Sequence, residues 1–258
     1  MSRSTVLNKP TEVSPSQRPT APTGSDQSTP SLVTPSEPNA RTGTLRETLR
    51  KVLLGCGIVS SVLYIALDVY AWSRYQGYSP FSQVYSELLA EGSPTRSLLL
   101  TLGAPYNPLV AALGFGVWAS PGHKRMLRIT GAMLVLYAIF SFLGGTLFQM
   151  DERGAEATAR GSLHPIVTGV MLIFMLLSLV FGAFVHGTRF RLYSIGTILT
   201  IGVFASLTFL YSPQLAANEP TPGIGLLERV NIYAWMVWVA LLSVSLWHGT
   251  HAEARASS

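Results

Sequence analysis

From about position 52 onward, the chain alternates between long apolar runs and short polar connections. Each run is close to the roughly 20 residues that a helix needs to cross a bilayer core. The runs lack the polar stripe of a soluble amphipathic helix and the period-two alternation of a β-barrel strand. The pattern therefore predicts six transmembrane helices, at residues 52–72, 97–120, 126–149, 165–185, 192–211 and 230–247.

The first 43 residues have a different character, because they are rich in Ser, Thr and Pro and contain no aromatic residue. Such a segment cannot bury enough apolar surface to offset the entropy cost of ordering it. No apolar h-region follows the start, so the pattern does not predict a cleaved signal peptide. We expect three parts: a disordered cytoplasmic tail at 1–43, a six-helix transmembrane domain at 44–250 and a short cytoplasmic tail at 251–258.

The composition supports this interpretation. Hydrophobic residues make up 48% of the chain and charged residues only 12%, about half the charged fraction of a soluble domain. The single cysteine, Cys56, cannot close an intramolecular disulfide, which excludes a disulfide scaffold. The predicted fold class is therefore all-α: a polytopic membrane protein with a bundle of six transmembrane helices.

Lysine and arginine predict the orientation of the bundle. They are concentrated before the first helix and in the second and fourth connections, whereas acidic residues offset them on the other side. An even helix count places both termini on one side, and the positive-inside rule makes that side cytoplasmic. We expect a multi-pass protein of the cell (inner or plasma) membrane. The same bias explains the net charge of +5, and no soluble basic face with interleaved aromatics indicates a nucleic-acid partner.

The first external connection predicts a short amphipathic helix at about residues 80–90. Ser79 is a suitable N-cap, and Pro80 suits the first helical position. We expect this helix to lie at the outer interface, where it covers either the bundle or a site that opens outward. Its apolar stripe consists of Phe81, Val84, Tyr85, Leu88 and Leu89.

Polar residues gather at the outer ends of the helices. Asp151 and His164 end the third helix and begin the fourth, and Arg229 opens the sixth. A carboxylate beside an imidazole suits a structural hydrogen bond, acid–base chemistry or a metal ligand, and Arg229 suits an ion pair or an anionic headgroup. The spacing matches no known metal motif, and we predict neither a metal nor a cofactor. The candidate outer-face polar cluster is Glu87, Asp151, His164 and Arg229.

A second set of residues indicates a cavity. The Pro105–Pro108 pair predicts a kink in the second helix, and kinked helices often line binding cavities. A carboxylate within a transmembrane helix should face the bundle interior or water. Arg229, Tyr233 and Met236 lie at i, i+4 and i+7 of the predicted sixth helix and so share one helix face. The candidate cavity lining is Asp68, Asn107, Tyr233 and Met236.

Four segments carry a family resemblance: GYSPFSQVYSEL, LGAPYNPLVAALGFGVW, FQMDERG with the later GSLH, and GIGLLERVNIYAWMVWVALL. Together they resemble the bacterial and archaeal integral membrane proteins grouped as domain of unknown function 998, over roughly residues 50–250. The resemblance implies a six-helix fold and marks the outer face, but it brings no activity. The family-like positions are Gly77, Tyr78, Pro80, Ser86, Glu87, Asp151, His164, Glu228 and Arg229.

Three functions are compatible with these features. The first, which we favour, is a protein that binds or moves a lipid or small amphiphile through a cavity opening to the outer face. The second is a membrane-embedded enzyme that uses Asp151 and His164 at the outer boundary. The third is a non-catalytic scaffold subunit. The expected partners are membrane lipids and a small amphiphilic ligand, and the pattern identifies no protein partner.

Overall fold

The computed structural model describes residues 37–256, and these residues form helices and connections without a strand. Six of the helical segments are long and apolar enough to cross a membrane, which confirms the predicted six-helix fold. The elements are α1 (Glu37–Arg74), the 3₁₀ helix η1 (Tyr85–Leu89), α2 (Arg96–Leu102), α3 (Tyr106–Trp118), α4 (Lys124–Thr146), α5 (Ala159–Gly182), α6 (Thr188–Leu210), α7 (Ser212–Ala216) and α8 (Ile224–Ala256).

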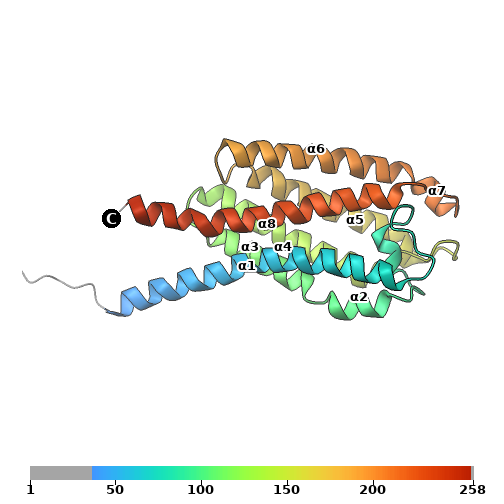
Figure 1. The fold of residues 1–258 in the computed structure, drawn as a ribbon, viewed down its shortest axis with the longest axis horizontal. Coiled ribbons are helices and arrows are strands. Elements are labelled where there is room, and N and C mark those ends of the chain that lie inside the picture. The colour runs from blue at the N-terminus through green and yellow to red at the C-terminus, as the bar shows by residue number, and fades with distance from the viewer. Residues whose placement is uncertain (1–36, 257–258) are drawn as a thin grey trace, which may run out of the picture.

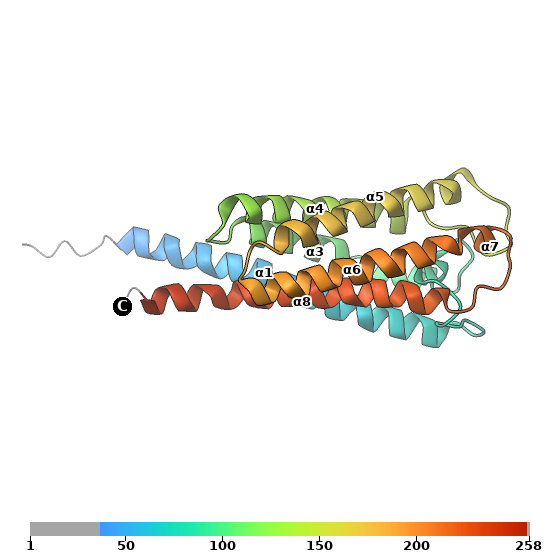
Figure 2. The same cartoon turned by 90° about the horizontal axis from the view of Figure 1, so that it is seen from above.

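The helices run along one long axis (Figures 1 and 2). The first residues of α1 and the last residues of α8 lie together at one end, here called the terminal end. The connection at residues 75–95, with η1, and the short helix α7 lie at the opposite end, here called the loop end. Helix α1 already begins at Glu37, inside the stretch predicted as tail, and α8 continues past 250 to Ala256. The rest of the predicted N-terminal tail, residues 1–36, lies outside the described residues.

The second membrane span, Arg96–Trp118, consists of two helices, as the prolines predict. Helix α2 ends at Leu102, the Gly103 N–H donates to the Leu99 carbonyl at 2.9 Å, and Pro105 precedes the first residue of α3. A proline lacks the N–H that would continue the ladder of hydrogen bonds. The predicted kink is therefore a break in the helix near the loop end.

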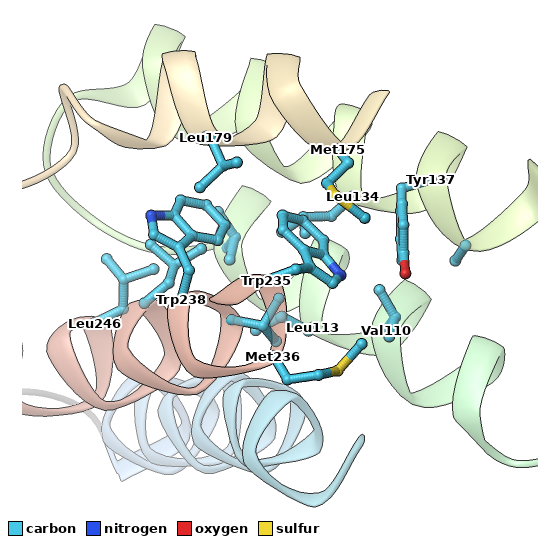
Figure 3. Packing of buried hydrophobic residues seen from close by; sticks show 14 of the residues in the cluster. Val110, Leu113, Leu134, Tyr137, Met175, Leu179, Trp235, Met236, Trp238 and Leu246 are labelled. Atoms are coloured by element: carbon cyan, nitrogen blue, oxygen red, sulfur yellow. The ribbon is translucent and has the colours of Figure 1, made fainter. Parts of the chain in front are cut away.

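The core lies where α8 meets α3, α4 and α5 (Figure 3). Trp235 and Trp238 of α8 are fully buried and stack with ring centroids 5.4 Å apart. The Trp238 Nε1–H donates to the Ser194 hydroxyl at 2.9 Å, and Tyr137 packs against Trp235 with centroids 4.8 Å apart. Lipid is as apolar as this core, so close packing and these buried hydrogen bonds, rather than the hydrophobic effect, hold the helices together.

Two glycines allow α3 and α4 to approach closely. A Cβ added at Gly131 would lie 2.5 Å from the Gly114 carbonyl oxygen, and one added at Gly114 would lie 2.8 Å from the Gly131 carbonyl oxygen. The two backbones are therefore in mutual contact, which only glycine permits. By contrast, a Cβ at Gly196 or Gly202 of α6 would meet nothing within 4 Å, so not every glycine of the membrane spans serves close packing.

The predicted interfacial helix is replaced by a shorter structure. Only Tyr85–Leu89 is helical, as a 3₁₀ turn, and residues 79–83 form hydrogen-bonded turns. The reason is that donors from elsewhere bind the carbonyl groups that an α-helix would use. Thr221 donates to Ser82, the amides of Gly225 and Leu226 donate to Phe81, and Arg229 and Tyr78 bind the remaining carbonyls at Pro80, Gln83 and Val84.

Candidate functional site

Arg229 of α8 forms a buried ion pair with Asp68 of α1. Its Nε and Nη2 donate to the two carboxylate oxygens of Asp68 at 3.0 and 2.9 Å. Asp68 is 0% exposed and Arg229 6% exposed. The Tyr233 hydroxyl donates to the same carboxylate at 2.6 Å. A bidentate pair of this kind fixes the relative position of the two helices, because the guanidinium plane must match the carboxylate plane.

The remaining N–H groups of Arg229 hold the connection at residues 75–95. Nη1 donates to the carbonyls of Pro80 and Gln83 at 2.9 and 3.0 Å and lies 3.3 Å from that of Gly225, and Nη2 donates to the Tyr78 hydroxyl at 2.9 Å. A guanidinium has five N–H groups, and each has an acceptor here. Arg229 therefore acts as a structural anchor and has no N–H group left for a lipid headgroup.

Tyr78 completes this anchor from the connection itself. Its hydroxyl lies 2.9 and 2.8 Å from the Gln83 and Val84 carbonyl oxygens, which share its one hydrogen. Burial raises the pKa of the Tyr78 phenol, although the neighbouring Arg229 guanidinium acts in the opposite direction. The phenol thus stays neutral at physiological pH and keeps the hydrogen that it donates.

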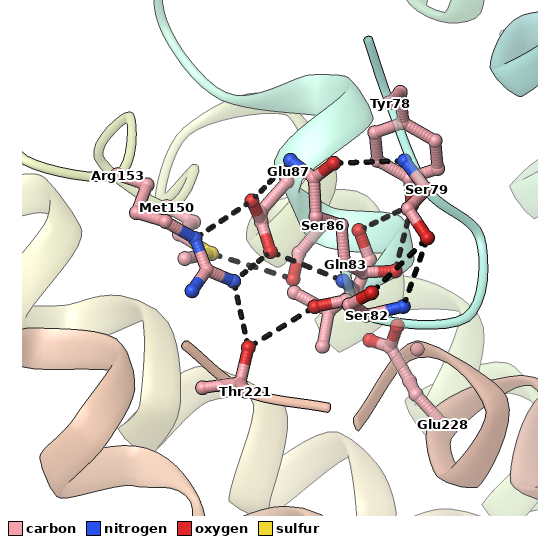
Figure 4. Close-up of polar contacts among 12 residues, drawn as sticks. Tyr78, Ser79, Ser82, Gln83, Ser86, Glu87, Met150, Arg153, Thr221 and Glu228 are labelled. Carbon is pink, nitrogen blue, oxygen red and sulfur yellow. Dashed lines mark hydrogen bonds and ion pairs between the residues drawn. The ribbon is translucent and has the colours of Figure 1, made fainter. Parts of the chain in front are cut away.

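Glu87 is held by a second, separate ion pair (Figure 4). Arg153, in the connection after α4, donates to the two Glu87 oxygens at 2.8 and 3.2 Å and to the Thr221 hydroxyl at 3.1 Å. Glu87 also accepts the Val84 N–H at 3.1 Å and an amide N–H of Gln83 at 3.0 Å. Glu87 thus links η1 to the connection between α4 and α5, and Arg153 links both to Thr221, in the segment before α8. These three linked segments are here called the cap, and they lie at the loop end.

Asp151 and His164 each bind a local partner rather than each other. Asp151 accepts the N–H and the hydroxyl of Thr158, at 2.9 and 2.7 Å, and Thr158 in turn caps α5. The Nδ1 of His164 lies 2.7 Å from the Phe148 carbonyl oxygen. A carbonyl only accepts, so Nδ1 carries a hydrogen and donates it to Phe148. The expected cluster of Glu87, Asp151, His164 and Arg229 is thus divided among separate partners.

A cavity of about 390 Å³ lies in the loop-end half of the bundle. Helices α3, α4, α5, α6 and α8 and the connection with η1 all contribute to its wall. This volume is within the usual range for small-molecule sites. Its apolar lining includes Phe140, Met171, Met175, Ala205 and Phe209.

Of the four residues expected to line a cavity, the structure places two in this wall. Asn107 and Met236 line it. Asp68 and Tyr233 instead belong to the hydrogen-bonded group around Arg229, which also includes Tyr78 and is here called the anchor network. His164, expected in the polar cluster, also lines the cavity.

Two asparagines contribute to this wall. The Asn107 and Asn231 Oδ1 atoms are buried and have no hydrogen-bond partner in the described part of the chain, and both residues line the cavity. The buried Trp235 ring packs against Tyr137 in the same wall. Because both oxygens are buried, they lie within the packed wall rather than at the surface of the cavity.

The sequence reasoning did not include Glu228, Asn231 and Trp235 in the site. They lie at i, i+3 and i+7 on α8, so they share a helix face, and all three line the cavity. One Glu228 oxygen also accepts the Tyr85 N–H of η1. Their spacing is visible in the sequence, but the adjacent face of Arg229, Tyr233 and Met236 contains a cation and so gives the stronger signal of a site.

The comparisons with known proteins agree with this picture of the fold. A family model described as "Protein of unknown function (DUF998)" matches residues 58–245. No curated protein and no solved structure matches the chain significantly. The matched region runs from within α1 to within α8 and so includes the anchor network and the cavity. The chain is a multi-pass membrane protein that belongs to the DUF998 family.

Proposed function

We propose that this protein binds a lipid or small amphiphile in the loop-end cavity and presents or moves it across the outer part of the membrane. The observation that carries the proposal is a cavity with a largely apolar wall that also includes a few polar side chains, among them Asn107, Asn231 and Glu228. An apolar wall suits a hydrocarbon chain, and convergent polar groups suit a head group.

The wall is also suited to chains of varying shape. It includes Met171 and Met175 of α5 and Ala205 and Phe209 of α6. Methionine side chains are flexible and polarizable, so they adapt to irregular ligands. The cap formed by Glu87 and Arg153 lies over the same end of the bundle and would limit entry from that side.

We further propose that the loop end faces outward and the terminal end faces the cytoplasm, in a cell membrane. The support is the excess of Lys and Arg near the terminal end of the bundle and the mixed charge at the loop end. With this orientation the cavity lies in the outer half of the bundle, and an amphiphile would reach it from the outer leaflet.

The experiment is to identify by mass spectrometry what the protein retains in nanodiscs, and then to fill the cavity. Ala205→Phe adds an aromatic ring to the wall from α6, and Gly145→Leu adds a branched aliphatic side chain from α4, where an added Cβ meets nothing within 4 Å. We expect both variants to lose most of the retained amphiphile.

The matched control is Val203→Phe, at an exposed position of the same helix α6. It should retain the ligand as the unchanged protein does. Equal retention by Gly145→Leu, Ala205→Phe and Val203→Phe, in variants with unchanged melting temperature, would exclude this cavity as the binding site.

A further inference from the structure

Resting on the proposed function, we infer that the cavity binds an amphiphile whose head group is an ammonium cation. Two observations support this assignment: a carboxylate in the wall that has no cationic partner, and a series of aromatic rings that begins beside it.

Glu228 differs from two other carboxylates of the loop end because it has no counter-ion. Asp68 is paired with Arg229, and Glu87 is paired with Arg153. In the part of the chain that the structure describes, no ion pair includes Glu228, and its hydrogen-bond partner is the Tyr85 N–H. A carboxylate within a membrane bundle is costly unless a proton or a positive charge neutralises it. A cationic ligand would supply the missing charge.

The Glu228 carboxylate can be reached from the cavity. The residue lines the cavity and is only partly buried, whereas Asp68 is fully buried. Its side chain extends from α8 toward the connection that carries η1 (Figure 4), where one oxygen accepts the Tyr85 N–H. The other oxygen has no hydrogen-bond partner in the described part of the chain, yet protein atoms do not enclose it, so it is open to the cavity.

Aromatic rings continue from this carboxylate along the wall. The Tyr85 ring of η1 lies 4.8 Å from the Tyr64 ring of α1, centroid to centroid, and the Tyr106 ring of α3 lies 4.9 Å from that of Tyr64. All three residues line the cavity, and Tyr64 and Tyr85 are partly exposed. The face of an aromatic ring carries partial negative charge and attracts a cation, as in sites that bind substituted ammonium groups. These rings and Glu228 therefore favour the same head group.

The wall gives an anionic head no comparable partner. Among the described residues that line the cavity, Glu228 is the only Asp, Glu, Lys or Arg. His164 is the one histidine of that lining, and imidazole is mostly neutral above its ordinary pKa of about 6.5. An anionic head would thus lie beside a like charge, and an uncharged head would leave the Glu228 charge without compensation.

The test compares three amphiphiles with the same twelve-carbon chain in the full-length protein. They are dodecyltrimethylammonium, laurate and monolauroylglycerol, added at about pH 8 to nanodiscs of an uncharged galactolipid, so that imidazole is neutral and no bilayer lipid carries an ammonium group. Occupancy is read by native mass spectrometry and expressed relative to the amount of each amphiphile in the bilayer. We expect dodecyltrimethylammonium to bind at least about 10-fold more tightly than the other two. Equal or tighter binding of laurate or monolauroylglycerol would overturn the inference.

A variant of Glu228 tests the charge directly. Glu228→Gln keeps the side-chain volume and an oxygen that can accept the Tyr85 N–H, so the fold should be retained. It should weaken dodecyltrimethylammonium binding about 10-fold and leave monolauroylglycerol binding unchanged. The matched control is Glu156→Gln, which removes the same charge at an exposed position of the loop end and should change neither. Unchanged dodecyltrimethylammonium binding in Glu228→Gln would contradict the assigned contact.

A pair of variants at Tyr64 tests the ring. Tyr64→Phe keeps the aromatic face and should bind dodecyltrimethylammonium as the unchanged protein does, whereas Tyr64→Leu should bind it about 3- to 10-fold more weakly. The melting temperature of each variant shows whether the bundle is intact. Equal binding by the two variants would remove the aromatic contribution.

The outcomes separate this inference from the proposed function. If Gly145→Leu expels a retained amphiphile with an anionic or uncharged head, the cavity binds ligand but the assigned head chemistry is wrong. If no probe binds and Gly145→Leu changes nothing that the protein retains, both the head chemistry and the proposed binding function are wrong.

Discussion

Asp68 and Arg229 lie 161 positions apart in the chain and form a bidentate ion pair, with Nε and Nη2 at 3.0 and 2.9 Å from the carboxylate oxygens. The pair joins α1 to α8, and through the other N–H groups of Arg229 it also anchors the connection at residues 75–95. One buried cation thus fixes the position of two membrane helices and of the cap above them.

This relationship predicts a large loss of stability when one partner is removed. Asp68→Ala leaves a buried guanidinium uncompensated, which typically costs about 3–5 kcal/mol. Unfolding in detergent should show that loss, and protease cleavage within residues 75–95 should become faster. The double variant Asp68→Leu with Arg229→Met should regain part of the stability. A melting temperature of Asp68→Ala equal to that of the unchanged protein would contradict the structural role.

The contact between α3 and α4 predicts strong sensitivity at Gly131. Gly131→Ala places a Cβ 2.5 Å from the Gly114 carbonyl oxygen, so the helices must separate. We expect a destabilisation of about 1–3 kcal/mol, typical of an overpacked contact. The control is Gly196→Ala, where the added Cβ meets nothing within 4 Å; it should be neutral or stabilising, since alanine is the better helix former. Similar unfolding curves for both variants would rule out the close approach.

Asp151 should behave as a structural residue. Asp151→Ala removes the acceptor of the Thr158 N–H and hydroxyl, and we expect a loss of about 1 kcal/mol, as for other helix-capping groups. Retention of the bound amphiphile should not change. The control Glu156→Ala, exposed in the same connection, should alter neither property. Loss of the ligand or of a stoichiometric metal ion from Asp151→Ala, measured by mass spectrometry and elemental analysis, would instead assign Asp151 to a binding site.

The proposed orientation predicts opposite labelling of two exposed positions. In a Cys56→Ser background, a cysteine at Ala157, in the loop-end connection between α4 and α5, should react with an impermeant maleimide in intact cells. A cysteine at His123, in the terminal-end connection before α4, should react only after lysis. The reverse pattern would invert the orientation and place the cavity toward the cytoplasm.

The amino-acid sequence by itself determined the membrane fold. The length and polarity of the six apolar runs require six spanning helices, because each run must satisfy its backbone hydrogen bonds within the bilayer. Pro105 and Pro108 determined the break in the second span for a similarly local reason, the missing N–H. The positions of the loop-end polar residues near the ends of helices also follow from the sequence alone.

Only the tertiary structure decided which of these polar residues meet. Arg229 had several acidic groups within plausible reach, and helix periodicity gives the face of a side chain but not the rotation and pairing of distant helices. In the packed bundle Arg229 binds Asp68, and Glu87 binds Arg153. Asp151 and His164 bind Thr158 and Phe148, which lie in the connection between α4 and α5. Tertiary contacts also explain why residues 80–84 are not helical. Groups of α8 donate to their carbonyls: the Gly225 and Leu226 amides bind Phe81, and Arg229 binds Pro80. The cavity arises from the space that the packed helices leave between them, which no local pattern specifies.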